Sequence, residues 1–175
     1  MKIQHKIFLF LFIFSPVIIS AQPLNQTITD PSDSSLMGYG YFDKHLFDIP
    51  QFNSWFNAEY DSYKPDKKVI KALIKKIPED LSIVIVMGTW CSDSRREVPR
   101  FHKICDIIGI KPETLIRIAI NRAKTTEHVN MEHLKIERVP TFIIYRLHKE
   151  VGRIIETPTQ SLEKDLLEII KKKPE

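Results

Sequence analysis

Residues 81–87, LSIVIVM, constrain the fold of this chain more than any other segment. Apart from Ser82, every residue in the run is apolar, and most are β-branched. An apolar run of this length, without alternating polar residues, is typical of a strand that is buried on both faces. Such a strand needs a layer of structure on each side, and we therefore predict an α/β fold.

The rest of the chain alternates between helical and strand patterns. Asp66 has the character of a helix N-cap, and apolar residues then recur at helical spacing. We expect helices at 66–76, from just after Cys91 to about 108, at 125–134 and from 161 onward, and strands at 81–87, 115–120, 141–147 and 151–156. This order predicts a mixed sheet of about four strands, flanked by helices on both faces.

The segment 88–99, GTWCSDSRREVP, follows the buried strand and opens the next helix. At a helix N-terminus, unpaired N–H groups and the helix dipole favour negative charge, and hence the thiolate of Cys91, which is the reactive form of cysteine. Ser94, one turn later, can donate a hydrogen bond to that sulfur. The nearby arginines add positive potential: Arg95, Arg96 and Arg100. Asp93 and Glu97 partly offset it. We predict that Cys91 is a nucleophile and that Ser94 assists it.

The order of elements and the motifs together resemble the thioredoxin family over roughly residues 66–172. The matching features are Trp90-Cys91 after the central strand, Pro99 inside the following helix, Val139-Pro140-Thr141 at the start of the third strand, and Gly152 in the last strand. The chain looks especially like exported bacterial thioredoxin-like proteins with a WCSDS (CxxS, monothiol) motif. The resemblance implies a thioredoxin-like fold with a cis Pro140. It also implies that Trp90, Val139, Pro140 and Thr141 bind substrate beside Cys91.

Two positions depart from the family pattern. Ser94 stands where thioredoxins have the resolving cysteine, and Ile85 stands where they have a buried aspartate. We therefore predict thiol–disulfide exchange by one cysteine, which forms mixed disulfides with exported proteins or low-molecular-weight thiols and needs a second thiol as reductant. The alternative is a non-catalytic, client-binding or chaperone-like domain. A third interpretation makes Cys91 an inert residue of a degenerate fold.

The second cysteine, Cys105, lies on the apolar face of the same predicted helix. Along a helix, Cys91 and Cys105 would be separated by about 21 Å, whereas a disulfide needs Cα atoms within about 7 Å. We predict that the two do not pair and that Cys105 belongs to the core. The formal net charge is +4, and no basic stripe with interleaved aromatics occurs. We expect no nucleic-acid partner, no cofactor, no metal site and a monomer.

The first 21 residues have the pattern of a signal peptide. Lys2 and Lys6 precede the apolar run 7–19, and Ser20-Ala21 supplies a small-residue cleavage site. An uncleaved anchor is the alternative, although the apolar run is shorter than the roughly 20 residues that span a bilayer. We expect an exported or periplasmic protein, off the membrane after cleavage.

Three segments would make up the mature chain. Residues 22–36 are expected to form a flexible leader, and residues 37–65 an aromatic-rich extension that either packs over the core or binds a partner. The thioredoxin-like domain is expected at 66–175.

Overall fold

The computed structural model describes residues 23–127 and 129–174, so the predicted signal peptide lies outside the described residues. The strands are β1 (Gln26–Thr29), β2 (Leu36–Tyr41), β3 (Leu81–Met87), β4 (Leu115–Ala119), β5 (Thr141–Arg146) and β6 (Lys149–Ile155). The α-helices are α1 (Pro50–Ser62), α2 (Lys67–Lys76), α3 (Ser92–Ile108) and α4 (Leu162–Ile170). Short 3-10 helices are η1 (Lys44–Asp48), η2 (Pro112–Thr114) and η3 (Glu132–Leu134).

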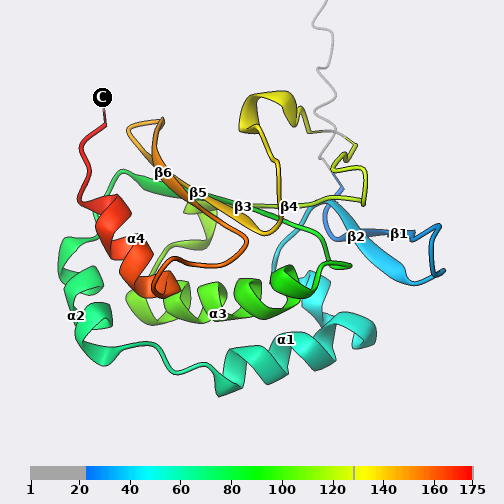
Figure 1. Ribbon diagram of the computed structural model, residues 1–175, viewed down its shortest axis with the longest axis horizontal. Coiled ribbons are helices and arrows are strands. Elements are labelled where there is room, and N and C mark those ends of the chain that lie inside the picture. The colour runs from blue at the N-terminus through cyan, green and yellow to red at the C-terminus, as the bar shows by residue number, and fades with distance from the viewer. Residues whose placement is uncertain (1–22, 128, 175) are drawn as a thin grey trace, which may run out of the picture.

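The strands form one mixed sheet in the order β1-β2-β4-β3-β5-β6 (Figure 1). Strand β3 pairs in parallel with β4 and antiparallel with β5, and all of its residues except Ser82 are buried. The register sets Val86 of β3 opposite Thr141 of β5. The loop after β3 and the segment before β5 therefore meet at the same end of these two strands. The predicted α/β class is confirmed, with six strands where about four were expected.

The two additional strands form a hairpin from residues 26–41, a segment that includes most of the expected flexible leader. This segment is therefore not the flexible leader that was expected, and the reason lies in the turn between the two strands. Asp30 closes the turn, since its carboxylate accepts hydrogen bonds from the backbone N–H and the hydroxyl of Ser32, at 2.9 and 2.7 Å. Polar residues that indicate a loop in the sequence thus serve as turn residues. Strand β2 then extends the sheet by pairing Gly40 and Tyr41 with β4.

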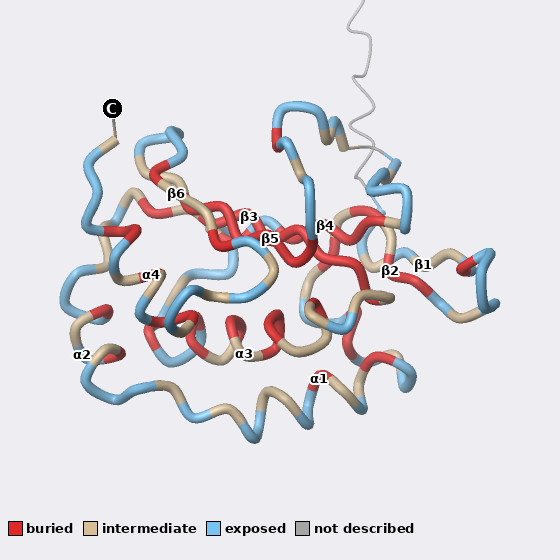
Figure 2. The backbone as a smooth tube through the Cα atoms, viewed as in Figure 1, coloured by how far each residue is buried: buried red, intermediate tan, exposed pale blue. Residues whose placement is uncertain are grey.

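One face of the sheet carries all four α-helices (Figure 1). Ile83, Ile85 and Met87 of β3 point into this layer and pack with the buried side chains of α3, which runs through its middle (Figure 2). Figure 2 shows the buried residues concentrated along the central strands and the inner side of α3. No described helix has the length and apolar character to cross a bilayer.

The prediction of helices on both faces is wrong for α-helices, because the segments 121–127 and 129–140, with only the short η3, cover the other face and the helix expected at 125–134 does not form. Side chains compete with the helical backbone there. The side-chain oxygen of Asn121 accepts from the N–H of Thr125 at 3.0 Å, and that of Asn130 accepts from the N–H of Glu132, also at 3.0 Å. Leu134 of this loop covers Val84 and Val86, which are the second face of β3.

Helix α1 holds several aromatic residues of the segment 37–65. Phe52 and Phe56 are buried, and Phe56 stacks on Phe47 with 4.0 Å between ring centroids. The helix also packs along α3, where Arg100 pairs with Glu59 at 2.8 Å. In the structure this segment contributes to the core.

Candidate active site at the start of helix α3

Cys91 is the N-cap residue of α3 and follows β3 after a tight turn. Its N–H donates to the Gly88 carbonyl at 2.9 Å, and its own carbonyl accepts from the Arg95 N–H at 3.0 Å. Cys91 is partly exposed, and both cysteines of the chain are free. Cys91 therefore combines partial solvent access with a place at the positive end of a helix dipole.

Val139 lies directly across from this cysteine. The Cys91 thiol donates to the Val139 carbonyl oxygen at 3.2 Å. The Val139–Pro140 peptide bond is cis, and β5 starts at the next residue, the buried Thr141. The hydroxyl of Thr141 donates to the Arg138 carbonyl at 2.6 Å, which holds the turn before the strand. The structure thus brings the segment 139–141 to the sulfur.

Trp90 forms the wall on the other side of the thiol. Its indole N–H donates to the Ile120 carbonyl at 2.9 Å. A Cβ atom on Gly88 would lie only 2.5 Å from the ring, so glycine is required beneath the indole. The Arg122 guanidinium covers the ring at 5.2 Å from its centroid. Trp90 is consequently fixed on three sides and leaves a partly exposed surface beside Cys91.

Ser94 differs from the role that its sequence position suggested. Its side chain is fully buried, and its hydroxyl oxygen accepts a hydrogen bond from the Gly88 N–H at 3.2 Å. Within the described residues, no hydrogen bond joins Ser94 to Cys91. A buried backbone N–H needs an acceptor, and Ser94 supplies it at the turn between β3 and α3. Ser94 therefore stabilises the loop that presents the cysteine.

The three arginines of this helix are engaged with partners of their own. Arg95 donates to the Thr89 carbonyl at 2.6 Å, and Arg96 contacts Asp93 and Glu97 at 2.8 and 2.6 Å. Arg100 pairs with Glu59 on α1. Carboxylates thus balance the charges of Arg96 and Arg100, whereas the partner of Arg95 is a neutral carbonyl, so Arg95 and the helix N-terminus both contribute positive potential near Cys91.

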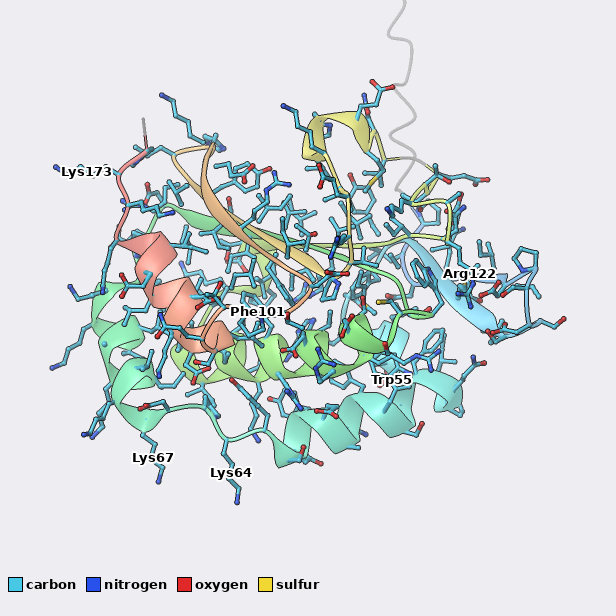
Figure 3. All side chains as sticks on the ribbon, in the orientation of Figure 1. Trp55, Lys64, Lys67, Phe101, Arg122 and Lys173 are labelled. Carbon is cyan, nitrogen blue, oxygen red and sulfur yellow. The ribbon has the colours of Figure 1, made fainter. Side chains whose placement is uncertain are left out.

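Sequence reasoning missed the contact between the β1–β2 hairpin and this site. Arg122, which lies beside the hairpin in Figure 3, pairs with the fully buried Asp30 at 2.6 Å while it stacks on Trp90. Burial alone would raise the pKa of Asp30, but the hydrogen bonds from Ser32 and Arg122 hold it below its usual value. Asp30 and Arg122 are 92 positions apart, and no periodic pattern links them.

A second contact joins the hairpin directly to the loop before Cys91. The Gly38 N–H of β2 donates to the Thr89 hydroxyl oxygen at 3.0 Å. The Cβ that a side chain at Gly38 would add lies 3.0 to 3.3 Å from Leu46, Thr89 and Ala119, which is closer than ordinary packing. Gly38 therefore allows β2 to approach the active-site loop. The hairpin therefore helps to hold the loop that precedes Cys91 in place.

Cys105 belongs to the core of the molecule, as predicted. Its side chain is fully buried, and burial, followed by the nearby Asp106 carboxylate, raises the pKa of the thiol to about 12. It is therefore protonated at neutral pH and unreactive. Among the residues that the structure describes, no group of three or more His, Cys, Asp or Glu side chains could hold a metal ion.

Comparisons with known proteins bear on the fold and the family of this chain. The chain is similar to a rat protein, thioredoxin domain-containing protein 2, with 25% identity over 104 residues; these cover 59% of this chain but only 18% of the rat protein. A crystal structure of a protein of unknown function from Pseudomonas aeruginosa superposes with a TM-score of 0.51 at 13% identity, over 70% of this chain and 85% of that one. An HIV epitope scaffold gives a TM-score of 0.52 at 12% identity, over 70% and 86% of the two chains. These two structures bear on the fold alone.

The region from α1 to α4 also matches a protein-family model. A family model described as thioredoxin matches residues 53–167, which is more than half of the chain and includes Trp90, Cys91 and Pro140. Family membership is consistent with a redox or thiol function in general. On this match, together with the fold and the placement of the cysteine, the chain belongs to the thioredoxin family.

Proposed function

We propose that this protein carries out thiol–disulfide exchange with Cys91 as its single reactive cysteine. One observation carries the proposal: Cys91 is partly exposed at the N-terminus of α3, whereas the other cysteine, Cys105, is fully buried in the core. Position 94, one turn from Cys91, holds a buried serine hydroxyl. The chain therefore has no second accessible thiol with which Cys91 could form a disulfide.

The proposed reaction has two steps, each an exchange of one sulfur–sulfur bond for another. In the first, the Cys91 thiolate attacks one sulfur of a partner's disulfide, forms a mixed disulfide and releases the partner's other sulfur as a thiolate. In the second, an external thiol loses its proton and attacks the mixed disulfide. The new disulfide leaves with the partner, and Cys91 returns as a thiolate. The net result depends only on which thiols and disulfides are supplied.

The walls of the site support docking of an extended partner. The Val139 carbonyl lies 3.2 Å from the sulfur, and the Trp90 indole is fixed on the other side by Ile120 and Arg122. We propose that a bound segment passes between Trp90 and the segment 139–141. Such a segment would place a partner sulfur at Cys91 and exchange hydrogen bonds with backbone groups around Pro140.

Trapping with glutathione disulfide tests the proposal. We expect the protein to gain one glutathionyl group, detected by intact mass, and peptide mapping should locate it on Cys91. Cys91→Ala should remain unmodified, and Cys105→Ala should be modified at the wild-type rate. Modification of Cys105, or no modification of a folded wild-type protein, would contradict the proposal.

We propose exported proteins and low-molecular-weight thiols as partners, in an extracytoplasmic compartment, on the basis of the N-terminal sequence. The competing function is a client-binding domain that holds partners without exchange. Both functions share the groove beside Cys91, but only exchange requires the sulfur. If Cys91→Ala binds a disulfide-bearing client and protects it as well as the wild type, and the wild type forms no mixed disulfide, the binding function is correct.

A further inference from the structure

A second concave surface lies far from Cys91, where the α1–α2 connection meets α2 and the C-terminal half of α3. It is an open groove of about 450 Å³. Its apolar surface comes from Tyr63 and Pro65 in the connection, Ile70 of α2 and Ile107 of α3. Ile70 is buried at its base, whereas Ile107 keeps 44% of its surface exposed. A groove of this volume lies in the range of known ligand sites, about 300–1,000 Å³.

The groove has a basic rim. Four of its lining residues are lysines: Lys64, Lys67, Lys71 and Lys103. No lining residue in the described part of the chain is acidic. Lys103 donates to the Asp61 carbonyl at 3.1 Å. The ammonium groups of Lys64, Lys67 and Lys71 have no hydrogen-bond or ion-pair partner among residues 23–127 and 129–174. Figure 3 shows Lys64 and Lys67 extending outward from this side of the molecule.

We propose that this groove binds an anionic amphiphile, namely a free long-chain carboxylate. A hydrocarbon chain covers the exposed surface of Ile107 and the apolar side chains beside it, which removes apolar area from water. The carboxylate then lies among the three lysines that lack partners, and charge complementarity orients the ligand.

Two other occupants fit the groove less well. Most of the lining residues belong to α2 and α3, where the backbone beyond the first turn is bonded within the helix, so an extended peptide would find few backbone partners there. A bilayer surface presents headgroups and is not shaped to fill a concavity lined by Ile70 and Ile107. A single acyl chain satisfies both the shape and the charge.

The groove is independent of the cysteine chemistry. Ile107 lies 16 positions after Cys91, which corresponds to about 24 Å along α3. A ligand bound there does not contact the thiol. We therefore expect mixed-disulfide formation at Cys91 to proceed at the same rate with and without the carboxylate, and the two proposals can fail separately.

Titration with dodecanoate, below its micelle concentration and followed by ¹H–¹⁵N NMR, tests the proposal. We expect saturable shifts at α2, at the α1–α2 connection and at the end of α3. The variant K67Q/K71Q should weaken the affinity about fivefold through lost charge, and Ile107→Ser about fivefold through lost apolar contact. The matched controls K111Q/K135Q and Ile116→Ser, whose side chain is 45% exposed on β4, should leave the affinity unchanged.

Neutral and membrane probes separate the alternatives. Dodecyl maltoside, which has the same chain and a neutral headgroup, should bind more weakly by about the same fivefold factor as the charge variant. Equal affinity for the neutral probe, or a K67Q/K71Q variant that binds dodecanoate like the wild type, would overturn the proposal. So would binding only to phosphatidylglycerol vesicles or to an acidic peptide, with no saturable response to dodecanoate.

Discussion

The residue at position 94 decides which chemistry the site can perform. Ser94 lies one helical turn from Cys91, and Cα atoms three positions apart in a helix are about 5 Å from each other. Cα atoms in disulfides are about 4.4–6.8 Å apart, so the backbone at this turn suits a disulfide although the side chain present cannot form one. The buried hydroxyl instead accepts from the Gly88 N–H and closes the turn before α3.

Ser94→Cys should therefore convert the protein into a dithiol enzyme. We expect the variant to form a disulfide between Cys91 and the introduced thiol on oxidation, and to reduce insulin with dithiothreitol at a rate well above that of the wild type. Ser94→Ala serves as the control, because it removes the acceptor for Gly88 without adding a thiol and should cost about 1–2 kcal/mol of stability. A folded Ser94→Cys variant that keeps both of these thiols free after oxidation would show that the loop geometry is different.

Cys105→Ala separates a structural cysteine from a reactive one. Removing one heavy atom from a fully buried site should lower the free energy of unfolding by about 1 kcal/mol, measured by urea denaturation. The rate of glutathionylation at Cys91 should not change. A lower rate in a fully folded variant would implicate Cys105 in the reaction.

The residue-scale features differ in how far the sequence could predict them. The proximity of Trp90, Cys91 and Val139 follows from the family motifs, and the structure places them together. The predicted orientation of Ser94 was wrong, because sequence position alone does not say whether a hydroxyl meets a sulfur or a backbone N–H. The Asp30–Arg122 pair was missed because its members are 92 positions apart.

At the scale of elements, the N-terminal hairpin and the thioredoxin-like core act as one unit around the cysteine. The hairpin reaches the site through Asp30–Arg122–Trp90 and through Gly38–Thr89. Strands β3 to β6 and helices α2 to α4 were recognisable from periodicity and caps, since each follows a local pattern. The hairpin and the loop 121–140 were not, because side-chain hydrogen bonds and tertiary pairing decide their conformation.

Breaking the Asp30–Arg122 pair should loosen the hairpin. Because the pKa of folded Asp30 is lowered, its contribution to stability is present above the unfolded value of about 3.9 and is lost as the pH falls through the folded value. Asp30→Asn should lower the melting temperature at neutral pH and reduce hydrogen-exchange protection in β1 and β2, with a much smaller difference from the wild type in strong acid. The exposed Asp48→Asn is the control. Equal protection of the hairpin in wild type and Asp30→Asn would contradict this account.

At the scale of the whole molecule, the helical layer contains a buried histidine that opposes folding in acid. His102 of α3 packs against the rings of Phe47 and Phe56, and neither of its ring nitrogens has a hydrogen-bond partner among the described residues. Burial, with smaller effects from Arg117 and Lys44, lowers the pKa of His102 to about 3. The core therefore holds this side chain in its neutral form.

This histidine predicts a broad loss of stability in acid. At pH values between the unfolded pKa of about 6.5 and the lowered folded pKa, the unfolded chain binds a proton that the folded protein excludes. The free energy of unfolding therefore falls by about 1.4 kcal/mol for each unit by which the pH is lowered in this range. His102→Leu should remove this slope and, by deleting two unpaired nitrogens, stabilise the protein at neutral pH by about 1–2 kcal/mol. Urea denaturation across pH measures both effects, and the exposed His133→Gln is the control. An unchanged slope in His102→Leu would contradict the prediction.

In the proposed reaction, Cys91 captures a partner's sulfur and needs an external thiol for release. The most direct test is the rate of release from a pre-formed Cys91–glutathione mixed disulfide as the glutathione concentration is varied. We expect a rate that rises linearly with the concentration of external thiol and extrapolates to zero in its absence, for the wild type and for Cys105→Ala alike. Release at a rate independent of added thiol, and lost in Cys105→Ala, would show that the chain resolves its own disulfide and would contradict the account.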